Sequence, residues 1–233
     1  MAVLSREEVI VGILALQGAF VEHQAMLKKL SLKQKIVVAQ VRSVEDLNRC
    51  DALIIPGGES TTIAVLARVS GLLEPLRQFV KTKPVWGTCA GAILLSQTVE
   101  GTKKGGQEIL GGISIAIARN GWGSQVESFE ADLDVVGLRN SDKPFKGVFI
   151  RAPASPVVLG LTPGPNDAPI QVVARLHTSL LPPSLSSLDE NDPKTIVALR
   201  QGRHFLTTFH PELTQDHRFH EYFVKECVFP AAI

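Results

Sequence analysis

The amino-acid sequence predicts an α/β fold: a mostly parallel sheet with helices on both faces and an antiparallel extension. In residues 9–99, short apolar runs rich in β-branched side chains alternate with segments that have helical periodicity. Apolar strands separated by helices are typical of a parallel sheet that is buried on both faces. From residue 113 onward, strand-like runs follow one another with turns between them, which indicates antiparallel strands.

The elements of the first half alternate in order along the chain. One helix opens with Ser-Thr-Thr at residue 60, which predicts a side-chain cap at its start. The predicted strands are residues 9–18, 35–41, 51–58 and 84–89, and the predicted helices are residues 19–30, 60–80 and 90–99.

The second half contains six strand-like runs and then one C-terminal helix. Between residues 153 and 193 the chain is rich in Pro, Ser, Leu and Asp, which indicates a surface excursion. Nothing marks a domain boundary, so we expect residues 1–233 to form a single domain. The expected strands are residues 113–120, 128–136, 147–152, 170–176, 195–202 and 205–213, and the expected helix is residues 216–228.

Composition narrows the class of protein. The 24 Lys and Arg residues nearly balance the 23 Asp and Glu residues, so no basic surface for nucleic acid or a membrane is expected. The apolar stretch 9–16 is too short to span a bilayer and lacks the flanks of a secretory signal. Cys50, Cys89 and Cys227 have neither disulfide-framework nor metal-site spacing. We therefore expect a cytoplasmic protein without a metal.

One of these cysteines lies in a pattern that indicates chemistry. Cys89 stands between Gly87 and Gly91 where a strand meets a helix, and G-x-C-x-G has the form of a nucleophile elbow with cysteine in place of serine. The glycines permit a tight turn, and the amides that open the helix favour a thiolate. We expect Cys89 at an exposed corner. These residues alone leave open a small buried side chain at a turn.

A cysteine nucleophile needs a base, and the base needs an acid that orients it. Among the six histidines, His210 follows a strand-like run and precedes Pro211, which favours an extended backbone. Residues two apart in an extended chain point the same way, so Glu212 can reach the imidazole. The pattern predicts a triad of Cys89, His210 and Glu212, although His-Pro-Glu triplets also occur in surface loops.

A third motif, Pro-Gly-Gly-Glu-Ser, ends the strand predicted over residues 51–58. Its backbone amides, together with the amide of Ala90 beside the nucleophile, can form an oxyanion hole, which we assign to Gly58 and Ala90. A plain strand-to-helix turn capped by Ser60 is the alternative.

These motifs, in this order, resemble the class I triad glutamine amidotransferases, which are flavodoxin-like three-layer sandwiches. Within that class, the chain is similar to the glutaminase subunits of pyridoxal 5′-phosphate synthase. The similar segments run from Leu14 to Phe223, nearly the whole chain. They are LALQGAFVEH, LIIPGGESTT, WGTCAGAILL, RNGWGSQVESFEADL, GVFIRAP and TTFHPELTQDHRFHEYF.

The resemblance implies that the protein hydrolyses L-glutamine to glutamate and ammonia through a thioester on Cys89. It implies a hetero-oligomeric partner, the synthase subunit, which uses the ammonia to make pyridoxal 5′-phosphate (vitamin B6). No cofactor is implied, and the chain has neither a P-loop nor a dinucleotide fingerprint. The residues implied to hold glutamine are Gly58, Glu59, Ser60, Arg119, Ile150 and Arg151.

The charges in that set suit a zwitterionic amino acid. Without the resemblance, the two arginines could equally be solvated or structurally paired. Ser124 departs from the family, which has arginine there, and the change bears either on glutamine binding or on docking to the synthase.

Two other functions stay open at this stage. One is an amidotransferase that feeds a different acceptor synthase, which the GGESTT segment disfavours. The other is a non-catalytic regulatory protein on the same fold, which the complete triad disfavours.

Overall fold

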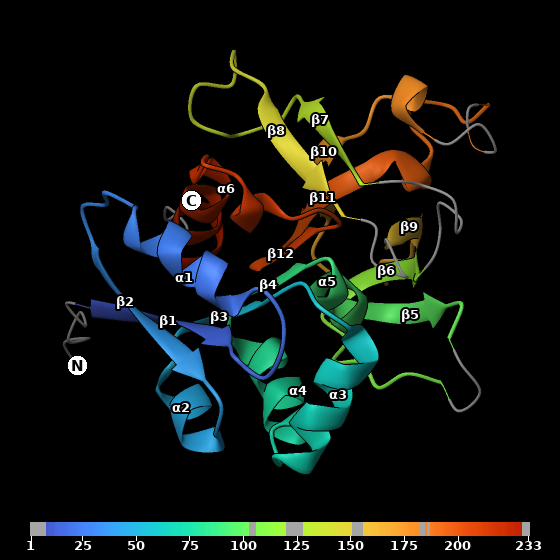
Figure 1. Ribbon diagram of the computed structural model, residues 1–233. Helices are drawn as coiled ribbons and strands as arrows, with labels where there is room; N and C mark the ends of the chain where they lie inside the picture. Colours follow the sequence, from blue (N-terminus) through green and yellow to red (C-terminus); the bar gives the residue numbers. More distant parts are fainter. Residues whose placement is uncertain are drawn as a thin grey trace.

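The computed structural model describes residues 8–102, 106–119, 128–150, 156–181, 185 and 187–229. Its centre is a seven-stranded sheet (Figure 1). In spatial order its strands are β10 (Ile170–Arg175), β11 (Ile196–Gln201), β12 (His204–Thr207), β4 (Val85–Thr88), β3 (Ala52–Ile55), β1 (Glu8–Leu14) and β2 (Lys35–Val41). The strands from β12 to β2 are parallel, and β11 and β10 continue the sheet in antiparallel pairing.

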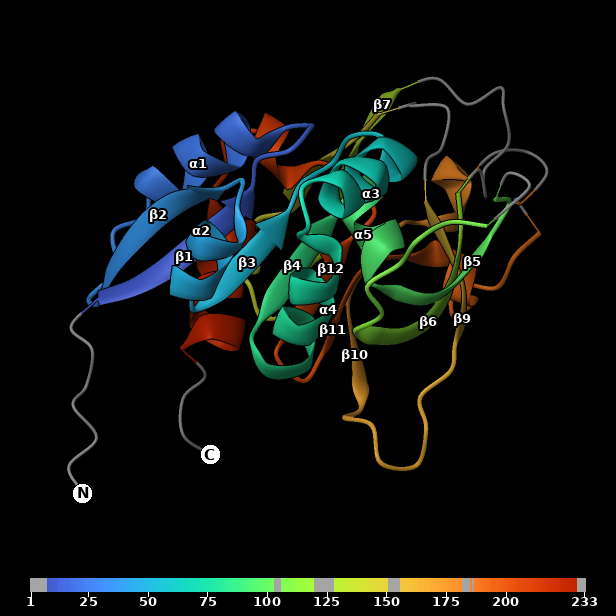
Figure 2. The same ribbon diagram turned by 90° about the horizontal axis from the view of Figure 1, so that it is seen from below.

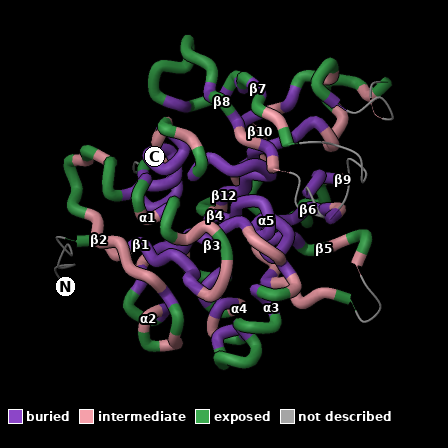
Figure 3. The backbone as a smooth tube through the Cα atoms, in the orientation of Figure 1, coloured by how far each residue is buried: buried purple, intermediate pink, exposed green. Residues whose placement is uncertain are grey.

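Alternate residues of the parallel strands face two separate apolar layers. Val11 and Ile54 pack into one layer, whereas Leu53 and Ile55 pack into the other. Helices cover both faces of the sheet (Figure 2). The buried residues are concentrated in the sheet and in the helices beside it (Figure 3). The first face carries α1 (Phe20–Lys28), α6 (Arg218–Tyr222) and the π-helical turn η5 (Phe223–Val228). The second carries α2 (Val44–Arg49), α3 (Ser60–Val69), α4 (Leu73–Thr82) and α5 (Ala90–Leu95).

This arrangement confirms the predicted three-layer α/β sandwich. The expected antiparallel extension is divided, because only β10 and β11 join the main sheet. The remaining strands form two small sheets beside that edge (Figure 1). One contains β5 (Ser96–Glu100), β6 (Ile113–Ala118) and β9 (Val157–Leu161), and the other is the hairpin of β7 (Phe129–Leu133) and β8 (Phe145–Phe149).

Several predicted boundaries are wrong for identifiable reasons. The helix expected over residues 60–80 is two helices, and Gly71 between them has a φ of +74°, which favours glycine. The helix expected over residues 90–99 ends at Leu95, and the chain continues as β5 because its β-branched residues suit a strand. The elements α2 and β9 were not predicted, although a capping box at Ser43 opens α2.

Within the described ranges, no helix combines the length and apolarity needed to cross a membrane.

Candidate active site

A cavity of about 370 Å³ lies at the carboxyl ends of the parallel strands β1, β3 and β4. Functional groups gather at this edge in open α/β sheets, because several strand-to-helix loops meet there. The cavity brings together most of the residues that the sequence predicts for the site. Its lining is Gln17, Gly18, Ala19, Gly57, Gly58, Glu59, Ser60, Cys89, Ile93, Arg119, Ile150, His210 and Leu213.

Cys89 occupies the turn between β4 and α5, with a φ of 47° that non-glycine residues rarely adopt. Its amide donates to the carbonyl of Thr207 on β12 at 2.9 Å, which anchors the turn to the sheet. A Cβ on Gly87 would overlap the carbonyl of Gly91, and a Cβ on Gly91 would overlap the carbonyl of Ile55. The glycines are therefore required by close packing around the strained elbow.

The expectation that Cys89 is exposed is wrong. Only 2% of the residue is accessible, because α5 and the loop after β3 pack around the turn. Cys89 nevertheless lines the cavity, the space where a substrate would lie.

His210 and Glu212 form the rest of the predicted triad. His210 Nδ1 donates to Glu212 Oε1 at 2.7 Å, and both residues are buried. The His210 amide donates to Val148 of β8 at 2.9 Å, so the hairpin fixes the backbone before the short 3₁₀ turn η4 (Pro211–Leu213). A Cβ on Gly57 would overlap the His210 ring and come within 3.4 Å of the Cys89 Cβ. Base and nucleophile thus lie against the same glycine.

The electrostatics of His210 suit a proton carrier. Burial disfavours the charged imidazolium, but hydrogen bonds with Cys89 and Glu212 and their negative charges raise the pKa of His210 to about 10. Burial likewise disfavours the charge on Glu212, yet His23 and the hydrogen bond from His210 hold the pKa of that carboxyl below its ordinary value. The favoured state is an ion pair in which His210 carries the proton.

The other two cysteines differ from Cys89. Cys50 and Cys227 are fully buried in the two apolar layers. Burial raises the pKa of Cys50 to about 11 and that of Cys227 to about 12, which keeps both as thiols.

Of the residues assigned to the oxyanion hole, Ala90 directly follows the nucleophile and Gly58 lines the same cavity. Ala90 is the first residue of α5, so its amide has no acceptor within the helix. A Cβ on Gly58 would overlap the side-chain oxygen of Gln17. The role of both amides stays a prediction.

Glu59 and Arg119 meet at the cavity. Arg119 Nη2 donates to Glu59 Oε1 at 2.8 Å. Glu59 is also the N-cap of α3, since its carboxylate accepts from the amides of Thr61 and Thr62, so the predicted cap by Ser60 is wrong. Partial burial opposes the charge of Glu59, but the hydrogen bonds from Thr62 and Thr61 outweigh it and lower its pKa.

The remaining predicted binding residues divide into two groups. Ser60 and Ile150 line the cavity. The Ser60 hydroxyl donates a hydrogen bond to Gln107 Oε1 at 3.2 Å. Arg151 and Ser124 lie outside the described residues.

Sequence reasoning missed Gln17, Ile93 and Leu213 in the cavity wall. The Gln17 side-chain oxygen accepts a hydrogen bond from the Glu59 amide at 2.9 Å, and this contact holds the loop after β3. The available signal was its place near the carboxyl end of the strand predicted over residues 9–18, at the edge where functional groups gather.

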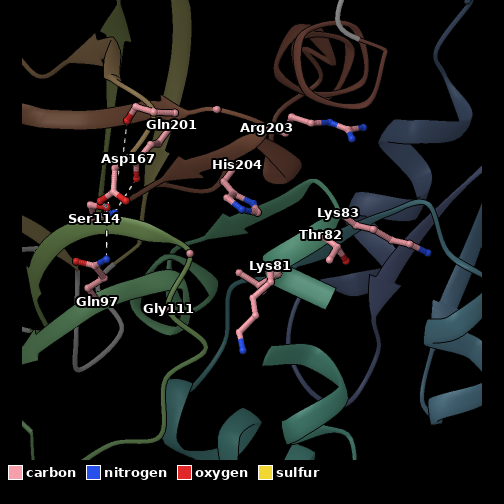
Figure 4. Close-up of a pocket in the computed structure, with 14 residues that line it drawn as sticks. Lys81, Thr82, Lys83, Gln97, Gly111, Ser114, Asp167, Gln201, Arg203 and His204 are labelled. Atoms are coloured by element: carbon pink, nitrogen blue, oxygen red, sulfur yellow. Dashed lines mark hydrogen bonds between the residues drawn. The ribbon is translucent and has the colours of Figure 1, made fainter. Parts of the chain in front are cut away.

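A second cavity, of about 510 Å³, lies at the amino ends of β4 and β12 (Figure 4). Two of its cationic side chains donate hydrogen bonds to backbone carbonyls: Lys83 to that of Cys50 and Arg203 to that of Cys227. Burial lowers the pKa of its histidine, His204, to about 4. Among the described residues that line it, no cysteine accompanies this histidine. In the part of the chain that is described, no three His, Cys, Asp or Glu side chains are grouped to hold a metal ion.

Comparisons with known proteins agree with this geometry. The chain matches the SNO glutamine amidotransferase family over residues 13–164 and 168–229. It is 45% identical over 226 residues to "Probable pyridoxal 5′-phosphate synthase subunit PDX2" of Arabidopsis thaliana, covering 92% of this chain and 84% of the relative. It is also 45% identical over 218 residues to "Pyridoxal 5′-phosphate synthase subunit PdxT" of Thermus thermophilus, covering 93% and 96%.

Among solved structures, one described as "Crystal structure of glutamine amidotransferase" superposes with a TM-score of 0.71 at 42% sequence identity. The superposition covers 94% of this chain and 98% of that one.

Proposed function

Because the chain belongs to the SNO glutamine amidotransferase family, we propose that it hydrolyses the side-chain amide of L-glutamine to glutamate and ammonia. It does so as the glutaminase subunit of a pyridoxal 5′-phosphate synthase, in line with the names of its relatives. The observation that carries the proposal is that Cys89 and His210 line one cavity of about 370 Å³ while the buried Glu212 is hydrogen-bonded to the His210 ring.

The first half of the reaction forms a thioester. The Cys89 thiolate attacks the side-chain amide carbon of glutamine, and the oxygen becomes negatively charged. The amides of Ala90 and Gly58 stabilise that charge. His210, which holds a proton because its pKa is about 10, donates it to the nitrogen. The carbon–nitrogen bond breaks, ammonia leaves, and the glutamyl group stays on Cys89.

The second half releases glutamate. The now neutral His210 accepts a proton from a water molecule as the water oxygen attacks the thioester carbon. The carbon–sulfur bond breaks, which returns Cys89 to the thiolate and His210 to the imidazolium. Glu212 orients the ring and stabilises its charge in both halves.

Glu59 and Arg119 bind the α-amino acid end of the substrate. Their side chains have the signs that an ammonium and a carboxylate require, and their mutual ion pair fixes both at the cavity. Arg151 adds a second cation for the carboxylate.

The partner of this chain is the synthase subunit, which consumes the ammonia. The acceptor reaction is assigned to that partner because the relatives of this chain are named as subunits of a pyridoxal 5′-phosphate synthase. The assembly is a hetero-oligomer in the cytoplasm.

The test is to identify the thiol that carries the glutamyl group. The chain, mixed with the synthase subunit of the same organism, is acid-quenched during glutamine turnover and its peptides are analysed by mass spectrometry. We expect equal amounts of glutamate and ammonia, and a glutamyl adduct on the peptide that contains Cys89.

The matched controls are Cys50→Ala and Cys227→Ala, which should keep the adduct, and Cys89→Ala, which should lose it. An adduct on Cys50 or Cys227, or a complex that releases no glutamate, would contradict the proposal.

A further inference from the structure

Two fully buried histidines lie behind the triad, and the reaction above does not use them. His23 on α1 and His220 on α6 are both 0% exposed. Their rings pack against Trp86 of β4, with centroids 5.5 and 4.9 Å from it. Each could be an inert core residue, so the polar contacts of the two rings decide the question.

His23 contacts the acid of the triad. Its Nε2 lies 3.5 Å from Glu212 Oε2 and 3.2 Å from the hydroxyl of Thr88, the residue before the nucleophile. Among the described residues, none forms a hydrogen bond of ordinary length with Glu212 Oε2. The other carboxylate oxygen, Oε1, accepts the hydrogen bond from His210 Nδ1. A small movement would make the His23 contact a full hydrogen bond.

The second nitrogen of His23 contacts His220. His23 Nδ1 lies 2.9 Å from His220 Nε2, while His220 Nδ1 has no partner among the described residues. A carboxylate accepts hydrogen bonds only, so it selects the tautomer of His23 with the proton on Nε2. His23 Nδ1 is then an acceptor, and His220 must donate from Nε2.

From this geometry we propose that His23, backed by His220, is a positioning residue that holds the second oxygen of Glu212. This inference rests on the proposed glutaminase function. Both rings are neutral, and the chain of donors runs from His220 through His23 to Glu212 and then meets His210. It keeps the acid ionised and aimed at the base without touching the substrate.

The charged and titratable groups around His23 agree with neutral rings. They are Glu212 and His210 at η4 and His220 on α6, with His217 acting on His220. Burial lowers the pKa of His23 to about 3, against the opposing attraction of Glu212, and burial also lowers the pKa of His220 to about 3. Neither ring should gain a proton across the working range of pH.

The experiment compares His23→Leu, which keeps apolar bulk but removes the donor, with His23→Gln, which keeps a donor. Glutamate release is measured in the complex with the synthase subunit between pH 5 and 10. For His23→Leu we expect kcat to fall about 10- to 100-fold with KM changed less than about twofold, as for other groups that orient a reacting side chain.

The pH profile supplies the readout that simple packing would not change. Without the His23 donor, the pKa of buried Glu212 rises, so the acidic limb of kcat should move up by about one pH unit. In His23→Gln, most of kcat should be retained, and the acidic limb should lie at the same pH as in the wild type. His204→Leu, which removes a half-buried histidine at the opposite end of the sheet, should change neither.

A second measurement, made on the wild-type protein, tests the inference even if the His23 variants fail to fold. In ¹⁵N-histidine-labelled wild-type protein, the ring nitrogens of His23 and His220 should report neutral rings with the proton on Nε2. A proton on His23 Nδ1, or titration of either ring between pH 5 and 9, would overturn the inference. So would an unshifted acidic limb in His23→Leu, or equal impairment of both His23 variants.

The two proposals can fail separately. A wild-type complex that releases no glutamate contradicts the proposed function, while the nitrogen spectrum still tests the hydrogen-bond chain. A wild-type complex that turns over while His23→Leu behaves normally contradicts only the positioning role.

Discussion

The two ends of strand β12 place a histidine in opposite electrostatic settings. His210 lies just beyond the carboxyl end and His204 is the first residue at the amino end, and each lines a cavity. Burial opposes charge on both rings, yet the pKa of His210 is raised to about 10 and that of His204 is lowered to about 4. The difference is the partner groups, because only His210 faces Glu212 and Cys89. A buried histidine becomes a proton carrier through its neighbours and not through burial.

The largest expected effect comes from removing the ring at the carboxyl end. His210→Asn should lower kcat for glutamate release by at least about a thousandfold, because nucleophile and base act as a unit. Adding Cys89→Ala to it should cause little further loss. Steady-state kinetics in the complex, with circular dichroism to verify folding, would measure this. Wild-type turnover in His210→Asn at saturating glutamine would exclude the base role.

A smaller effect is expected when the ring stays and its partner changes. Glu212→Gln removes the negative charge, so we expect a loss in kcat of about a hundredfold. The pKa of His210 should fall, because the charge that favours the imidazolium is gone. The alkaline limb of the pH profile should then move to lower pH. A pH–kcat profile of the variant would check this, and an unmoved or raised limb would contradict it.

The smallest effect on activity is expected at the amino end. His204→Leu should leave glutamate release unchanged and alter only stability in acid. The pKa of His204 is about 4 in the fold and about 6.5 in the unfolded chain, so the unfolded chain binds the proton more readily. This lowers the free energy of unfolding as pH falls from about 6.5 to about 4.

The variant should therefore lose less stability than wild type between pH 7 and 5, by on the order of 1 kcal/mol. Urea unfolding at the two pH values would measure the difference. An identical loss in both proteins would show that His204 is not shielded from water as the structure indicates.

The sequence predicted the parallel half and the triad because their signals are local. The apolar runs mark β1 to β4, and a glycine-flanked cysteine or a His-Pro-Glu triplet can be read within a few residues. The expected exposure of Cys89 was wrong because its burial depends on how α5, which follows it directly, packs with the loop after β3, which comes from an earlier part of the chain.

Longer-range features could not be predicted from the sequence. His23 and His220 are 197 residues apart and meet only after α1 and α6 pack on the same face. Glu59 and Arg119 are 60 residues apart, and their pairing depends on how β6 ends beside the loop after β3. In both cases residue type indicates a possible role, while the partner is decided by packing.

The crowded glycines around the elbow have a consequence for how the protein tolerates sequence change. Gly57, Gly87 and Gly91 carry no reactive group, yet a methyl group at any of them would occupy space already filled by His210 or by backbone. Mutational tolerance at this corner is therefore governed by excluded volume as strictly as by reactivity. A chemically silent position here can be as restricted as the nucleophile that it surrounds.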